Sequence, residues 1–78
     1  MITFADGIAT VAFTWPTNDT GGKTLRVMGD AALSALQATG YTVTARPAFH
    51  DLRPAGGSWE FLFTVPATPP ADPEGVTP

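Results

Sequence analysis

The segment Gly21-Gly22-Lys23-Thr24 is the first place where residue type and spacing suggest chemistry. A Gly-Lys-Thr sequence between a strand and a helix ends the phosphate-binding P-loop, whose backbone amides and lysine hold nucleotide phosphates. That motif also needs a glycine five residues before its Gly-Lys pair, and Thr17 stands at this position. We therefore interpret the segment as a loop that leads into a helix, whose N-terminus could still bind some other anion.

His50 and Asp51 form the second candidate, because a histidine beside a carboxylate is half of a catalytic dyad. Ser58 is a distant candidate nucleophile, and nothing in the sequence brings the three groups together. The chain has one histidine and no cysteine, which leaves no paired metal-ligand spacing. The sequence thus predicts no enzymatic activity, no cofactor and no metal. The competing hypothesis is a minimal enzyme or anion-binding domain that uses Lys23, His50 and Asp51.

Trp59, Phe61 and Phe63 alternate along the chain and form the third candidate. An open sheet face with such residues can stack on bases, as the sheets of RNA-binding domains do. Packing beneath a helix explains the same alternation. Nucleic-acid binding needs basic surroundings, and Arg46 and Arg53 are the only candidates for a cation near this face. The net charge of the chain is −3, so a general nucleic-acid role is disfavoured. A small regulatory protein that binds single-stranded nucleic acid is kept as the alternative function.

The elements that must position these residues begin with a hairpin. Ile2 to Ala5 and Ile8 to Trp15 are β-rich runs, and the Asp6-Gly7 pair between them is typical of a type I′ turn. A helix is predicted from Lys23 to Thr39, with Thr20 or Thr24 as N-cap and Gly40 just past its end.

The predicted helix has a narrow polar side. At about 100° per residue, Arg26, Asp30, Ser34 and Gln37 share one arc, and most of the remaining circumference is apolar. Two interpretations stay open: the alanines of the apolar part are exposed to solvent, or the helix is buried on two sides.

A third strand is predicted from Tyr41 to Ala45, and an extension past Pro47 to Phe49 stays open; a loop is then predicted from His50 to Gly57. The fourth strand should run from Ser58 to Val65 and end at Pro66. The expected fold is therefore α+β: a two-layer sandwich in ββαββ order, with one helix packed on a four-stranded, mostly antiparallel sheet. These elements make up a predicted domain of residues 1–65.

Residues 66–78 form a predicted C-terminal tail that holds five of the eight prolines. Asp72 and Glu74 make it acidic, and it lacks the basic anchor of proline-rich SH3 ligands. It is interpreted either as a disordered, solubilising end or as an extended arm that docks on a neighbouring subunit.

The predicted sheet is too wide for its helix. Four strands span about 19 Å at ~4.8 Å spacing, whereas a helix is roughly 10–12 Å in diameter. Surplus apolar surface on a small domain indicates an interface. The interface candidates are Trp15, Val27, Leu33, Phe49, Arg53, Trp59, Pro69, Pro70 and Pro73.

These features together predict a non-enzymatic assembly module that binds copies of itself or a larger protein assembly. Small size, absence of catalytic motifs and an extended tail are typical of a structural or accessory protein of a bacteriophage. The N-terminal residues lack the basic and apolar regions of a signal peptide, and no apolar run approaches the ~20 residues of a membrane span. We therefore expect a protein of the cytoplasm, or of a particle assembled there.

Overall fold

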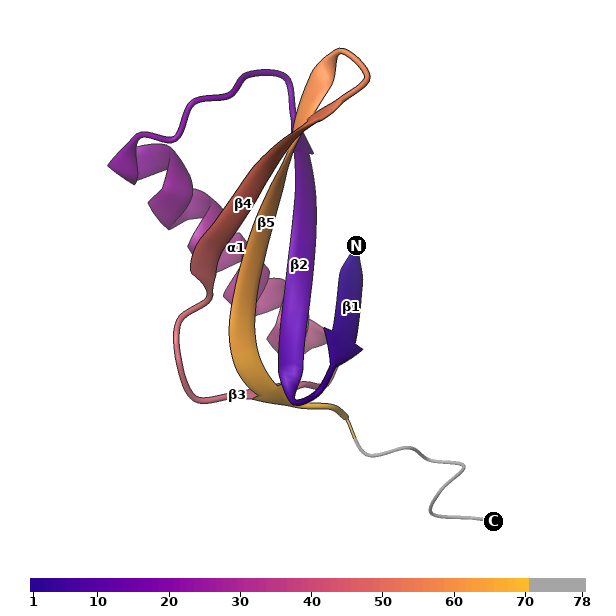
Figure 1. Ribbon diagram of the computed structural model, residues 1–78. Coiled ribbons are helices and arrows are strands. Elements are labelled where there is room, and N and C mark those ends of the chain that lie inside the picture. The colour runs from indigo at the N-terminus through magenta and orange to yellow at the C-terminus, as the bar shows by residue number, and fades with distance from the viewer. Residues whose placement is uncertain (71–78) are drawn as a thin grey trace.

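The fold is α+β, with one helix and an open five-stranded sheet whose paired strands are antiparallel (Figure 1). The structure is a computed structural model and describes residues 1–70. The elements, in chain order, are β1 (Ile2–Ala5), β2 (Ile8–Trp15), α1 (Gly22–Ala38), β3 (Thr42–Val43), β4 (Ala48–Ala55) and β5 (Ser58–Thr68). The order is thus ββαβββ, and the prediction of four strands is wrong by one.

The long strand β5 organises the sheet. β2 pairs with it along one side, whereas β4 and the short β3 share its other side, and β1 extends the sheet beyond β2. Because β2 and β3 are both antiparallel to β5, they run in the same direction with β5 between them. The open edges therefore belong to β1 on one side and to β4 and β3 on the other.

Two tight turns close the two hairpins. Asp6 and Gly7 both have positive φ angles, 53° and 79°, which confirms the predicted turn between β1 and β2. Gly56 and Gly57, at 53° and 89°, make the same kind of turn between β4 and β5. The predicted loop from His50 to Gly57 is therefore wrong, because most of it is strand.

Two prolines explain the other errors in strand bounds. The chain leaves strand geometry between β3 and β4, around Pro47, so the single predicted third strand is two. β5 does not end before Pro66 but continues to Thr68. Alternate residues of a strand direct their backbone groups to opposite neighbours, and the Ala67 amide donates to Gly7 on the β2 side. The nitrogen of Pro66 consequently faces the gap between β3 and β4, where no donor is needed.

The helix lies within one residue of its predicted bounds, but its N-terminus is capped differently. The N-cap position is Gly21, which has no side chain that could accept a capping hydrogen bond. The Asp19 carboxylate instead accepts hydrogen bonds from the Gly21 amide at 2.8 Å and the Thr24 hydroxyl at 2.7 Å. Both N-cap predictions, Thr20 and Thr24, are wrong, because Asp19 supplies the acceptor and Thr24 acts as a donor.

The C-terminus of α1 confirms the role predicted for Gly40. Its φ is 97°, its amide donates to Gln37 at 3.0 Å, and the Tyr41 amide donates to Leu36 at 2.9 Å. This pair of bonds is the Schellman motif, which requires a left-handed residue after the helix.

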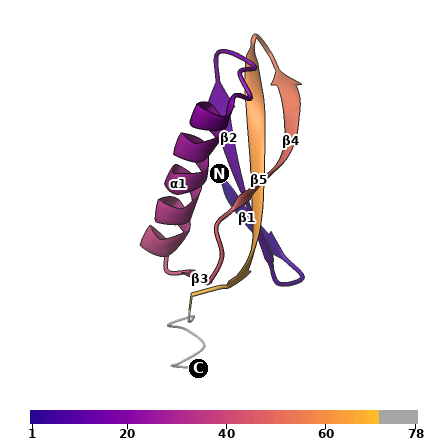
Figure 2. The ribbon, with the colours of Figure 1, turned by 90° about the vertical axis from the view of Figure 1, so that its left-hand side faces the viewer.

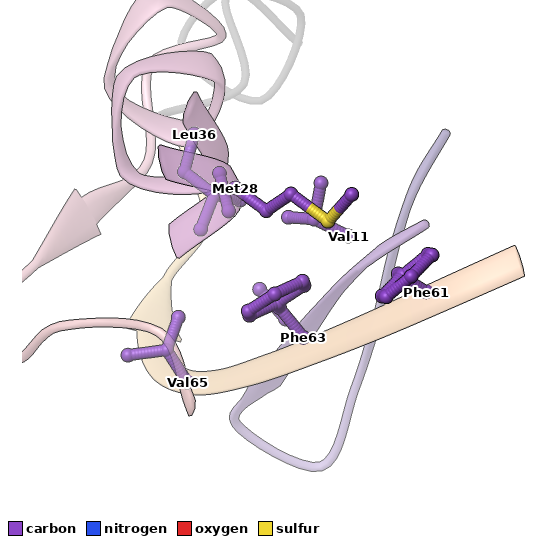
Figure 3. Close-up of a cluster of buried hydrophobic side chains, with 8 residues drawn as sticks. Val11, Met28, Leu36, Phe61, Phe63 and Val65 are labelled. Carbon is purple, nitrogen blue, oxygen red and sulfur yellow. The ribbon is translucent and has the colours of Figure 1, made fainter. Parts of the chain in front are cut away.

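The core lies between α1 and one face of the sheet (Figures 2 and 3). Met28, Ala32 and Leu36 of the helix pack on side chains from two central strands: Ala9 and Val11 of β2, and Phe61, Phe63 and Val65 of β5. The opposite face of the sheet has no helix on it in residues 1–70.

Candidate protein-binding groove

An apolar groove separates α1 from the C-terminal half of β2. It has a volume of about 480 Å³ and is lined by Phe13, Thr14, Trp15, Lys23, Thr24, Val27, Met28 and Ala31. The groove exists because the helix and the strands diverge there: the loop after β2 carries the chain away from the sheet before α1 begins (Figure 1). One helix leaves this end of the sheet partly uncovered, as expected from their widths.

Two large apolar side chains stand open at this groove. Trp15 is 47% exposed and Val27 is 60% exposed, whereas Met28 is buried and Phe13 is half-buried. Lys23 is the one charged residue in the lining. Such a surface can bind apolar side chains of another molecule and favours acidic groups near its rim.

The other side of the helix faces β4 and is more polar. A second depression there, of about 520 Å³, is lined by Gly22, Leu25, Arg26, Asp30, Arg46, Pro47, Phe49 and Phe63. Arg46 spans it: Nη1 lies 2.7 Å from the Asp30 carboxylate and Nη2 donates to the Arg26 carbonyl at 2.9 Å. Arg46 therefore ties the segment before β4 to the helix.

The sheet face without a helix carries mostly small and polar side chains, together with the buried Leu62 and the exposed Met1. Thr3, Thr10 and Thr64 lie in register across β1, β2 and β5, and a shallow hollow of about 320 Å³ lies over this face. The Asp51 carboxylate accepts from Arg53 Nε at 3.0 Å and from the Leu52 amide at 2.8 Å. The hydrogen bond from Arg53, followed by that from Leu52, holds the pKa of Asp51 below its ordinary value.

The predicted interface residues fall into separate regions. Trp15 and Val27 meet in the groove, and Trp59 is the cross-strand partner of Trp15. Of the others, Leu33 is half-buried on α1, and Phe49 packs on Phe61 and Phe63 on the far side of the helix. Arg53 lines the hollow on the uncovered face. Pro69 and Pro70 are exposed, and Pro73 lies outside the described residues.

Sequence reasoning did not assign Phe13 and Met28 to the groove. Phe13 lies two residues before Trp15, so the alternation of side chains along a strand already predicts that both lie on the same face of β2. Met28 follows Val27, and only the crossing of helix and strand brings it into the same groove as Trp15 and Phe13.

The residues of the enzyme and nucleic-acid hypotheses are not brought together. Lys23 lines the groove, whereas His50 lines the hollow on the opposite face of the sheet. Phe61 and Phe63 are 0% and 2% exposed beneath α1, so they cannot stack on bases. Among residues 1–70, no group of three or more His, Cys, Asp or Glu side chains could hold a metal ion.

Within the described part of the chain, no helix has the length and apolar character needed to cross a lipid bilayer. Neither a protein-family model, nor a curated protein, nor a solved structure matches the sequence or fold.

Proposed function

We propose that this chain is a non-enzymatic protein-binding module whose contact surface is the groove between α1 and β2. The observation that carries the proposal is the exposure of Trp15 and Val27 on either side of it, 47% and 60%. Tryptophan is enriched among the residues that dominate binding energy at protein interfaces. Exposed apolar side chains gathered beside a groove mark a surface that another molecule covers.

A protein partner fits this groove better than a small molecule. Binding sites for small ligands bury most of the ligand surface and place several polar groups against it. Here the walls are open, since Val27 is mostly exposed, and the polar lining is limited to Thr14, Lys23 and Thr24. A helix or strand of another subunit would cover both Val27 and Trp15 at once.

The partner in this proposal is another copy of the chain or a component of a larger assembly. Assignment to a bacteriophage particle stays a prediction from size and composition. The nucleic-acid alternative loses its main support, because two of its three aromatic residues lie in the core.

Site-specific photo-crosslinking in cells of the source organism tests the proposal. A photoreactive phenylalanine derivative replaces Val27 in one variant and Ser34 in a control, since Ser34 is exposed on the polar side of the same helix. We expect irradiation to give a discrete protein adduct from position 27 and none from position 34.

Equal adducts from both positions, or none from position 27 in a variant that folds as the wild type does, would contradict a binding role for the groove. The circular dichroism spectrum of each variant establishes whether it has folded.

A further inference from the structure

The two open edges of the sheet differ in how well they are protected against pairing with another strand. Natural edge strands carry charges, prolines or bulges that discourage such pairing. β4 has all three: a register shift between Phe49 and Asp51, the charged pair Asp51 and Arg53, and Pro54 near its end. β4 is thus a protected edge.

β1 has none of these devices. Its four residues, Ile2 to Ala5, include no charged side chain and no proline, and its pairing with β2 is regular throughout. Phe4 is 36% exposed, with its ring centroid 5.9 Å from that of Tyr41. Within residues 1–70, no strand other than β2 pairs with β1 (Figure 1).

The hydrogen bonds of β1 show which backbone groups are free. Met1 and Ala12 exchange two bonds, from the Met1 nitrogen at 3.0 Å and from the Ala12 amide at 2.8 Å. In an antiparallel pair such bonded positions alternate with positions that face away. The amides and carbonyls of Ile2 and Phe4 therefore point out from the edge of the sheet.

We propose that β1 pairs antiparallel with β1 of a second copy, which joins the two sheets into one. A two-fold axis beside Thr3 places Ile2 of each copy opposite Phe4 of the other, so that the outward amides and carbonyls bond reciprocally. Ile2 and Phe4 lie on the same face of the strand, so the apolar side chains of the two copies meet there.

A second copy suits this edge because the strand is complementary to itself. No charged residue lies in β1, and the centred register brings no like charges opposite each other. Thr3 would face Thr3 of the other copy, which extends the row formed with Thr10 and Thr64 across the shared sheet. Stable protein interfaces bury about 1,200–2,000 Å² of surface. Two strands of four residues bury less than this, so the dimer should form only at high protein concentration.

A charge exchange at Thr3 tests the pairing by sedimentation velocity over a range of concentrations. Thr3 is exposed on the uncovered face, so Thr3→Lys and Thr3→Glu leave the core intact. Each variant alone places like charges opposite one another and should dimerise more weakly, by up to about fivefold. A mixture of the two should form a heterodimer at least as strong as the wild-type dimer.

Thr42→Lys is the matched control, because Thr42 is also exposed but lies on β3, at the opposite edge of the sheet from β1, and this variant should dimerise as the wild type does. Trp15→Ala, in the groove, should leave this dimer unchanged as well, which separates the present proposal from the proposed function. A wild-type chain that stays monomeric at millimolar concentration would overturn the pairing. A dimer that is insensitive to both Thr3 variants, or a mixture no stronger than either variant alone, would do the same.

Discussion

Among the glycines of residues 1–70, Gly40 is the one where both a positive φ angle and a close neighbour oppose a side chain. Its φ of 97° lies in a region that side chains disfavour, and a Cβ at this position would lie 2.8 Å from the Cβ of Pro70. The first constraint could be predicted from sequence, because glycine after a helix is the usual C′ residue. The second could not, since it depends on where the chain passes after β5.

Gly40→Ala should therefore lower the free energy of unfolding by at least about 1–2 kcal/mol, the usual cost of left-handed geometry with a side chain. Chemical denaturation measures the loss. The double variant Gly40→Ala with Pro70→Gly removes the contact and should recover part of the stability. Wild-type stability for the single variant would show that the turn after α1 adjusts freely.

Gly29, which is buried within α1, gives the opposite expectation. A Cβ at Gly29 would lie 3.6 Å from Arg46 Nε and from the Pro47 carbonyl oxygen, which is ordinary van der Waals contact. A glycine inside a helix often has a packing reason, but here the structure leaves room for a methyl group.

Gly29→Ala should raise the free energy of unfolding by up to about 1 kcal/mol, because alanine favours the helix interior more than glycine does. Thermal or chemical denaturation provides the measurement. Gly29→Leu, which is too large for the same space, should destabilise. A loss of stability in the alanine variant would contradict the space that the structure leaves at this position.

At the scale of single elements, the first turn of α1 depends on a carboxylate outside the helix. The hydrogen bond from Thr24, followed by that from the Gly21 amide, lowers the pKa of Asp19 from its ordinary value of 3.8. A lowered pKa in the folded state contributes stability that is fully present above the unfolded value and is lost as the pH falls through the folded value.

Nuclear magnetic resonance should therefore show the Asp19 carboxyl and the Gly21 amide titrating together with a midpoint below 3.8. In Asp19→Asn the Gly21 amide should lose this titration, while Asp51 keeps its own. A midpoint at or above 3.8 for Asp19 would contradict the capping role.

The strands show what local sequence could and could not predict. The Asp6-Gly7 pair specifies its hairpin because β-rich runs flank it on both sides. Gly56-Gly57 is an equally good turn signal, but the segment before it does not read as a strand. The segment before it carries His50, Asp51, Arg53 and Pro54, which resemble a loop by composition. An edge strand tolerates these residues because one side of its backbone faces solvent.

At the scale of the whole molecule, the apolar surplus could be predicted but its place could not. The widths of the helix and sheet imply that one helix leaves apolar surface open. The crossing of α1 over the sheet decides that Trp15 and Val27 share a groove while Phe49 packs on the far side of the helix. A crossing of this kind depends on contacts between distant residues, which one sequence does not reveal.

The central claim is that the groove between α1 and β2 binds another protein, and Trp15 offers the most direct measurement. Trp15 is 47% exposed and belongs to no buried cluster, so Trp15→Ala should fold as the wild type does. The photo-crosslink from position 27 should be lost or strongly reduced when Trp15→Ala is added. An undiminished crosslink in that folded double variant would contradict the claim.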